Sequence, residues 1–254
     1  MRVIGTVFLA AFAALLGGCR AQYTTPGGPA DFRALGITAQ HADALTDGGI
    51  RERMNRKPAA SFPAVVAVVR VQDGRYRSYS LNPNDIVTRG EFSIISKRDV
   101  ENSVDMATLR NLPGLRDIAM LNRLVMPVAI TDNRDLRASA ADIHADILFL
   151  YTFDTRFGSE TKVPFLGSIT LGLFPAEQAR VSTTCSGAFI DTRTGYIYGL
   201  VEASADDDQL ANLWTTKDAT DQTRRRAESK AFKEMVEQAK ETWKRIVSEY
   251  GPRM

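Results

Sequence analysis

The feature that most constrains how this chain folds is the run Pro63-Ala-Val-Val-Ala-Val-Val-Arg-Val71, in which valine predominates. An uninterrupted β-branched run of this length is typical of a strand that is buried on both faces of its sheet. Asp73-Gly74 supplies a turn directly after the run. The sequence therefore predicts a central strand.

The middle of the chain predicts the entry to an α/β core. A helix over Asp135–His144 leads directly into the hydrophobic strand Asp146–Asp154. Two further strands, Ala179–Asp191 and Tyr196–Ala205, are joined by Thr192-Arg-Thr-Gly195, and Gly195 suits a left-handed turn. Weaker patterns predict a strand over Phe92–Ser96, a loosely alternating segment over Arg75–Leu81, and helices over Asp31–Ile37, Asp47–Lys57, Arg98–Leu109 and Leu115–Val125.

A long amphipathic helix is predicted to close the fold over Asp221–Tyr250, ended by Gly251-Pro252. Small or apolar residues recur every four positions along it, so that one stripe packs on the sheet while charges face water. These residues are Ala227, Ala231, Met235, Ala239, Trp243 and Val247. The expected fold class is α/β (α+β): a single mixed β-sheet with packing helices, a C-terminal hairpin and this closing helix, in one domain over residues 47–254.

The start of the chain has the outline of a secretory signal. Arg2 precedes an apolar stretch, Val3–Leu16, and small residues lead to Cys19. The stretch is shorter than the roughly 20 apolar residues that span a bilayer. We therefore expect residues 1–18 to be a signal peptide that is removed.

Leu16-Gly17-Gly18-Cys19 resembles the bacterial lipobox, although Ala, Ser or Thr is commoner where Gly17 stands. The resemblance implies that the Cys19 thiol takes a diacylglycerol and that cleavage and acylation of the new amine follow. An ordinary signal peptide beside a cysteine is the alternative. Several acyl chains on one residue would anchor the protein permanently, since each buried methylene contributes about 0.8 kcal/mol.

Residues 19–46 are then expected to be the lipidated cysteine and a tether, because Arg20–Pro29 is rich in residues that interrupt regular structure. In lipobox proteins an Asp after the cysteine implies retention at the inner membrane. Arg20 stands there instead, which favours a periplasm-facing position on the outer membrane.

Composition narrows the class of partner. Hydrophobic residues make up 44% and charged residues 24% of the chain, as in ordinary globular domains. Loss of residues 1–18 removes Arg2 alone among the charged residues, so the net charge falls from +2 to +1. This balance gives no reason to expect a nucleic-acid partner. Cys185 is the cysteine left after lipidation of Cys19, and we expect it to be a small buried residue.

Four features in this order resemble the α/β domain shared by the curli-secretion lipoprotein CsgG, the penicillin-binding-protein activator LpoB and the N-terminal domain of TolB. They are the strand Val65–Val71, the helix-to-strand run Ala141–Tyr151, the hairpin Ala188–Tyr196 and the closing helix, over roughly residues 60–250. The resemblance implies a role in envelope assembly. The pore-forming members insert two amphipathic hairpins per subunit, whereas this chain offers one apolar, loop-like segment, Val163–Pro175, which speaks against a pore.

That segment is the most promising contact site in the sequence. Its apolar side chains would mark a partner or oligomer contact if they were exposed. The alternative is an additional core strand over Ser168–Phe174. The candidate contact residues are Phe165, Leu166, Ile169, Leu171 and Phe174.

Motifs for catalysis or metal binding are missing from the sequence. Its two histidines, His41 and His144, form no zinc-binding pattern, and Gly-x-Ser-x-Gly is absent. Asp206-Asp207-Asp208 is interpreted as a solvated turn, since it lacks calcium-loop spacing. Arg224-Arg225-Arg226 is interpreted as a solvated helix start. Asp154 and Glu160 could serve as paired carboxylates, but charges flanking a strand end are usually solvated.

The sequence therefore predicts no enzyme, no cofactor and no metal. The leading hypothesis is a non-catalytic lipoprotein that binds or assembles envelope proteins, reaching the membrane through Cys19 and contacting an envelope protein or a second copy of itself. The alternatives are a small-molecule or cell-wall binding domain with weak hydrolase activity, and a purely self-associating domain.

Overall fold

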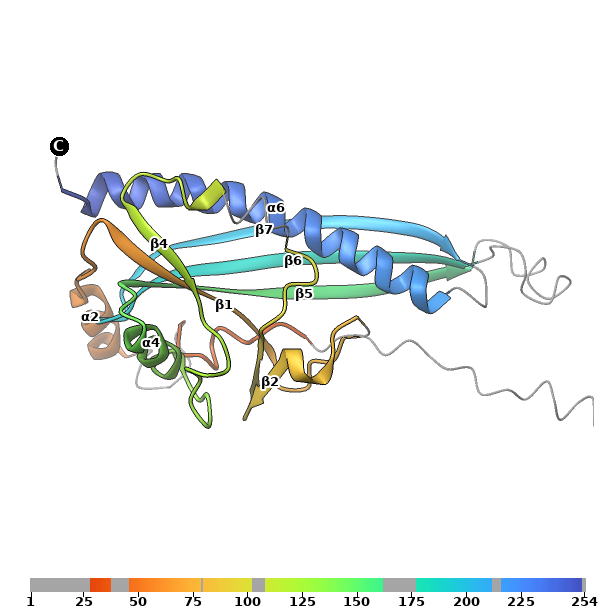
Figure 1. Ribbon diagram of the computed structural model, residues 1–254, viewed down its shortest axis with the longest axis horizontal. Helices are drawn as coiled ribbons and strands as arrows, with labels where there is room; N and C mark the ends of the chain where they lie inside the picture. Colours follow the sequence, from red (N-terminus) through yellow and green to blue (C-terminus); the bar gives the residue numbers. More distant parts are fainter. Residues whose placement is uncertain are drawn as a thin grey trace, which may run out of the picture.

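The computed structural model describes residues 28–37, 46–78, 80–101, 108–161, 177–211 and 216–252. Within these residues the chain forms one mixed sheet of seven strands in the order β2-β3-β1-β5-β6-β7, with β4 also paired to β1. Figure 1 shows the long helix α6 along one side of the sheet and α4 on the opposite side. The predicted α/β class with a long closing helix is confirmed. The elements are α2 (Asp47–Asn55), β1 (Ala64–Asp73), the 3-10 turn η2 (Pro83–Asp85), β2 (Ile86–Arg89), β3 (Phe92–Ile95), β4 (Leu115–Met120), α4 (Asn133–Asp142), β5 (Ile147–Thr161), β6 (Glu177–Asp191), β7 (Ile197–Ala211) and α6 (Thr216–Tyr250).

Strand β1 is central, as the valine run predicts. On one side, residues 66–69 pair in parallel with β5. On the other side, the first half of β1 pairs in parallel with β4 and residues 70–73 pair antiparallel with β3. All but two of its residues are buried, because helices and loops cover both faces.

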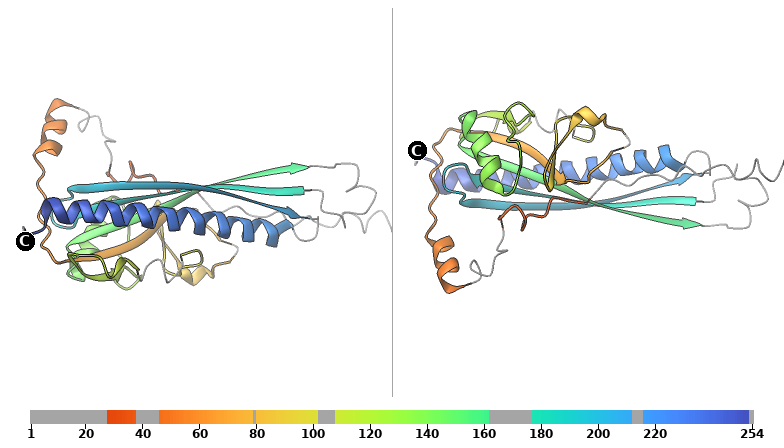
Figure 2. Two further views of the ribbon diagram at one scale, coloured as in Figure 1. Left: turned by 90° about the horizontal axis from the view of Figure 1, so that it is seen from above. Right: turned by 90° about the horizontal axis from the view of Figure 1, so that it is seen from below.

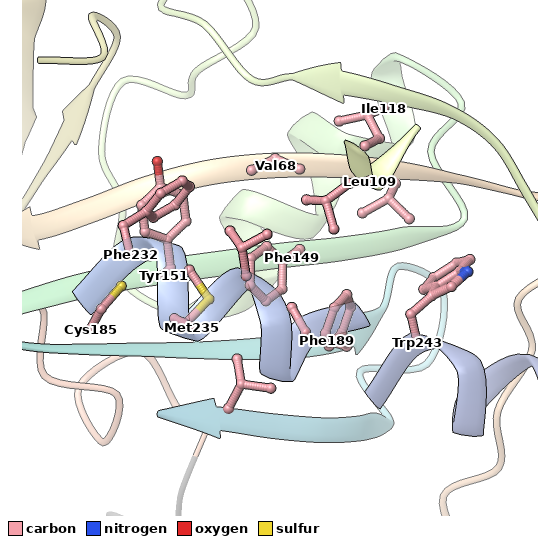
Figure 3. Packing of buried hydrophobic residues seen from close by; sticks show 14 of the residues in the cluster. Val68, Leu109, Ile118, Phe149, Tyr151, Cys185, Phe189, Phe232, Met235 and Trp243 are labelled. Atoms are coloured by element: carbon pink, nitrogen blue, oxygen red, sulfur yellow. The ribbon is translucent and has the colours of Figure 1, made fainter. Parts of the chain in front are cut away.

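Alternation along the strands divides the core between the two faces of the sheet. Phe149, Tyr151 and Phe189 face α6 and meet Met235 and Trp243 of that helix, as Figure 3 shows. Leu148, Leu150 and Ile190 point the other way and pack with Leu136 and Ala140 of α4. Cys185 is buried on the α6 side, so its predicted place in the core is confirmed.

Strands β5 and β7 are much longer than the sequence predicts, whereas β6 is two residues longer. Each has 15 residues, and α6 has 35, so the strands and the helix both extend about 50 Å. Figures 1 and 2 show the three strands and α6 running together past the rest of the sheet. We call residues 154–161, 177–184 and 204–211 the arm. No helix in the described ranges combines the length and the apolar character needed to cross a bilayer.

The hairpin turn between β6 and β7 agrees with its prediction. Gly195 has φ +70°, a left-handed conformation that favours glycine. The Asp191 carboxylate accepts the backbone N–H groups of Arg193 and Thr194, both at 2.9 Å. It also accepts the Ala59 N–H at 2.6 Å and the Tyr198 hydroxyl at 2.7 Å. Asp191 therefore joins the turn to the segment that leads into β1.

Three local predictions are wrong. Leu115–Val125 is not a helix, because residues 115–120 form β4 and bond to β1. Asp31–Ile37 forms hydrogen-bonded turns in place of a helix. Arg75–Leu81 forms no strand where it is described. Of the helix expected over Arg98–Leu109, residues 98–101 are irregular, residues 108–109 are helical, and 102–107 lie outside the described residues.

Residues 28–37, which fall within the predicted tether, pack against the sheet. Pro29 forms a bridge with Gln72 of β1, and the Ala30 N–H donates to the Thr152 hydroxyl at 2.8 Å. Leu35 is completely buried in the α4-side core. The residues from Gly28 to Ile37 therefore belong to the folded body of the protein and not to a tether.

Candidate functional site

The far end of the arm is where the chain leaves the sheet twice. Thr161, the last residue of β5, pairs with Glu177, which in turn pairs with Ala211 at the end of β7. The connection 162–176 therefore starts and finishes at this end, and the connection 212–215 starts there. The predicted contact residues belong to the first connection and lie outside the described residues: Phe165, Leu166, Ile169, Leu171 and Phe174. Cys19 also lies outside them, as does the alternative core strand Ser168–Phe174.

One face of the arm is covered by a helix and the other is exposed. Helix α6 lies over one face, where Val181 and Thr183 are completely buried. On the other face Arg156, Ser182 and Asp206 form one cross-strand row of exposed side chains. In the part of the chain that the structure describes, no layer covers this second face. The arm therefore presents a polar three-stranded surface.

Asp206-Asp207-Asp208 is not the solvated turn that the sequence suggests. All three residues belong to β7, the last strand in the sheet order. Asp207 faces α6 and binds Arg226 at 2.6 Å and Lys230 at 3.6 Å. Asp206 and Asp208 point to the open face, where charges on an edge strand discourage pairing with another strand.

A buried ionic cluster lies where the arm meets the rest of the sheet. It combines two arginines with four carboxylates, from β1, from the segment after β3 and from the first part of α6. Each side chain is exposed by 6% or less. The members of this cluster are Arg70, Asp99, Glu101, Asp221, Arg224 and Glu228.

Arg224 uses all three guanidinium nitrogens. Its Nε donates to Asp221 at 3.0 Å and its Nη1 to Glu228 at 2.6 Å. Its Nη2 donates to Asp99 at 3.0 Å and to the Ser80 hydroxyl at 2.9 Å. Because Asp99 and Ser80 belong to loops that precede β4, this side chain ties α6 to the other side of the cluster.

Arg70, on the central strand β1, also binds several members of the cluster. Its Nη1 donates to Asp99 at 3.0 Å and Glu101 at 3.4 Å, and its Nη2 donates to the Tyr76 hydroxyl at 3.0 Å. The guanidinium also lies over the Phe153 ring, 4.5 Å from the centroid, in a cation–π contact. Arg70 therefore links β1 to both loops and to β5.

Burial and opposite charges compete within the cluster. Burial lowers the pKa of Arg70, but the attraction of Tyr76, Glu101 and the other carboxylates outweighs it and raises that pKa well above its ordinary value. For Asp99, burial raises the pKa, and the two arginines outweigh it, so the pKa is lowered. For Glu228, burial prevails over Arg224 and Arg70, and the pKa is raised. The surrounding carboxylates therefore favour the charged form of Arg70, whereas burial disfavours the charged form of Glu228.

The cluster acts as a structural joint. Most of its polar atoms bind one another or a neighbouring hydroxyl, Nε of Arg70 being a buried exception: the Tyr151 hydroxyl donates to Glu101 at 2.8 Å, and the Thr155 hydroxyl donates to Glu228 at 2.9 Å. Removing one member of such a buried set leaves the others uncompensated, which typically costs about 3–5 kcal/mol. The interpretation of Arg224 as part of a solvated helix start is therefore wrong, since the side chain is completely buried. Only Arg225 and Arg226 are half-exposed.

The other candidate chemical groups do not meet. Asp154 and Glu160 both lie on β5, six residues apart, which corresponds to about 20 Å along a strand and exceeds the spacing of paired catalytic carboxylates. Burial raises the pKa of the Cys185 thiol well above its ordinary value, so this cysteine is not an activated nucleophile. No group of three or more potential metal ligands occurs among the described residues.

Comparison with known proteins adds little. No protein-family model matches the chain, and no curated protein matches it. Among solved structures the chain is similar to the crystal structure of protein XCC0632 from Xanthomonas campestris, which is described with the family DUF330. The two are 10% identical over 76% of this chain and 94% of that chain, with a TM-score of 0.35. So remote a likeness carries no argument about function.

Proposed function

We propose that this protein is a lipid-anchored envelope protein that binds or assembles other envelope proteins without catalysing a reaction, and that the partner is bound at the far end of the arm. The membrane attachment is Cys19, on the outer membrane and facing the periplasm. The apolar residues of the connection 162–176 make the contact. The leader, the lipobox and the resemblance to envelope-assembly domains support this proposal.

The observation that carries the proposal is the register of the arm. Three 15-residue strands end in one row, so the apolar connection 162–176 is carried at the end of the arm, and 212–215, which contains Leu213 and Trp214, begins in the same row. Large apolar and aromatic residues dominate the energetics of protein contacts. A site at the end of a long rigid element can reach a partner that the body of the protein does not touch.

The packing of α6 on the arm supports the same role. Helix α6 covers one face of the arm, and the buried ionic cluster fastens the helix to β1 through Arg70 and Glu228, 3.7 Å apart, and to the neighbouring loops through Arg224. A binding site is more specific when its support does not bend, because less conformational freedom is lost on binding. The charged groups that the structure gathers are paired with one another and buried, an arrangement that suits a joint better than a reaction centre.

A photo-crosslinking experiment tests this proposal in cells. A photoreactive amino acid is introduced at Phe165 or Phe174, in the connection at the end of the arm, and, as a matched control, at Val128, which is 93% exposed between β4 and α4. We expect a defined crosslinked species from the arm positions and none from Val128. Equal crosslinking from all three positions, or none from the arm, would overturn the proposal.

Replacing Leu171 with Asp distinguishes a foreign partner from a second copy. If the contact joins two copies, the variant should have the mass of a monomer by light scattering where the wild type is larger. If both are monomers and the arm still crosslinks in the wild type, the partner is another protein. A variant that unfolds would show that Leu171 belongs to the core.

A further inference from the structure

Helix α2 buries none of its residues. Ile50 is 51% exposed and Met54 is 80% exposed. Figure 2 shows α2 standing away from the sheet and from α6. The Thr46 hydroxyl caps the helix by accepting the Gly49 N–H at 3.2 Å, and the Thr46 carbonyl accepts the Ile50 N–H at 2.9 Å.

A helix in this situation needs a covering surface. Isolated helices shorter than roughly 12–15 residues are marginal in water, and most helical stability in proteins comes from packing an apolar face. α2 has nine residues and packs no face on the described body of the protein. Its two large apolar side chains are nevertheless placed four residues apart, on one side of the helix.

The charges of α2 are arranged around that apolar pair. At about 100° per residue, Ile50 and Met54 lie about 40° apart, while Arg51 and Arg53 fall about 80° to either side of their midpoint. Glu52 lies on the opposite side of the helix, where Arg56 binds it at 3.4 Å. The one acidic residue beside the stripe is Asp47, in the first turn, where a negative charge favours the helix dipole.

We propose that α2 lies on the surface of an anionic phospholipid bilayer, with Ile50 and Met54 inserted among the acyl chains and Arg51 and Arg53 among the phosphates. Apolar residues flanked by arginines are the pattern of an interfacial helix. The segment 47–57 has four basic and two acidic residues, a net charge of +2. The inference rests on the proposed function for the attachment that keeps the protein at a membrane.

The size of the apolar pair favours a lipid surface over a protein partner. A stable protein interface buries at least about 1,000 Å², which two side chains cannot supply. A bilayer contact can be far weaker, because an anchored protein meets the membrane at a high effective concentration. The chain from Cys19 to Gly28 and the chain from Ile37 to Thr46 each span nine residues, or at most about 32 Å, so anchor, body and α2 are closely tethered to one another.

The test uses the mature chain beginning at Cys19, coupled through that thiol to a maleimide phospholipid in vesicles. Cys185 does not compete, because it is buried. Hydrogen exchange of the amides in residues 47–55 is followed by mass spectrometry on two kinds of vesicle, phosphatidylcholine alone and phosphatidylcholine with phosphatidylglycerol. We expect exchange to slow about tenfold or more on the anionic vesicles, given the attraction of each arginine to an anionic surface.

Two double variants distinguish slowing that depends on insertion of Ile50 and Met54 from slowing that any vesicle-bound protein would show. Ile50→Ser with Met54→Ser should remove the slowing. Leu124→Ser with Val128→Ser, which changes residues 85% and 93% exposed elsewhere on the surface, should leave it intact. Exchange that is equally fast with and without anionic lipid would overturn the inference. Slowing that depends on protein density and persists on phosphatidylcholine would also overturn it, in favour of contact between copies.

Because the coupling is chemical, the result does not depend on whether cells lipidate Cys19. A protein that is not lipidated in cells but shows protected α2 amides on these vesicles would contradict the proposed function alone. A protein that is lipidated in cells but shows no protection would contradict the interfacial helix alone.

Discussion

Replacing Arg224 with methionine should destabilise the fold by about 3–5 kcal/mol, the range found when one partner of a buried ion pair is removed. Methionine approximates the length of the aliphatic stem, so the loss of packing is small. What disappears is a guanidinium that is completely buried and lies within 3.0 Å of three carboxylates. Each of these carboxylates is almost fully buried, so in the variant its charge would stay out of water without the guanidinium that compensates it.

The penalty should depend on pH in a defined direction. The pKa of Asp99 is lowered by its two arginines against the effect of burial, so its contribution to stability is present above the unfolded pKa of about 3.9 and is lost as the pH falls through the folded value. The pKa of Glu228 is already raised by burial, and loss of Arg224 would raise it further. The Glu228 effect makes the variant's deficit grow as the pH rises from about 4 towards 7, whereas the Asp99 effect reduces the deficit only below about pH 4.

Urea denaturation followed by far-ultraviolet circular dichroism, at pH 5 and pH 8, gives the free energy of unfolding of each protein. Arg225→Met is the matched control, since its side chain is 43% exposed and binds Asp221 alone at 3.4 Å, and its loss should cost less than about 1 kcal/mol. A deficit for Arg224→Met no larger than that of Arg225→Met, or one that is the same at both pH values, would contradict the structural role of the buried Arg224.

Three smaller predictions concern other parts of the fold. Asp191→Asn should cost about 2–3 kcal/mol at pH 7, because an amide cannot accept all four hydrogen bonds that this carboxylate accepts. Burial raises the pKa of Asp191, but these hydrogen bonds outweigh burial, so the pKa is lowered. The stability difference between wild type and variant should therefore shrink as acid protonates Asp191 in the wild type. Urea titrations at pH 7 and pH 3 measure that difference. Gly199→Ala should lower the thermal midpoint and destabilise the fold by about 1–3 kcal/mol, because a Cβ there would lie 2.6 Å from Thr242 Cγ2. Adding Thr242→Ser removes that methyl group and should restore most of the lost stability, as calorimetry would show. Cys185 should resist iodoacetamide at neutral pH in the native protein and react in urea, because the thiol is buried; mass spectrometry detects the adduct, and rapid labelling of the native protein would contradict the burial.

Some elements could be predicted because their signal is local. The valine run of β1 indicates a doubly buried strand without knowledge of its neighbours, and the four-residue spacing of Ala227, Ala231 and Met235 indicates the buried stripe of α6. Strand β4 could not be predicted in this way. Residues 115–120 have apolar spacing that also suits a helix, and their partner, β1, lies some 50 residues earlier in the chain. Pairing between distant segments decides their structure.

The arm and the ionic cluster were missed for a related reason. Charged residues such as Arg156 and Asp206 suggest solvated loops, but a strand tolerates them when one of its faces is open to water. Arg224 precedes Ala231 by seven residues, so both lie on the buried side of α6. That position was visible in the sequence, but a buried arginine is recognisable only once Asp99 and Glu228 are known to surround it.

The most direct test of the central claim is the intact mass of the membrane-extracted protein, together with fractionation of wild-type cells and Cys19→Ala cells. We expect a mass that corresponds to a chain beginning at Cys19 and carrying acyl chains, and a variant that no longer fractionates with the membrane. An unmodified mass, or a wild type that stays in the soluble fraction as the variant does, would contradict the claim that this protein acts from a lipid anchor.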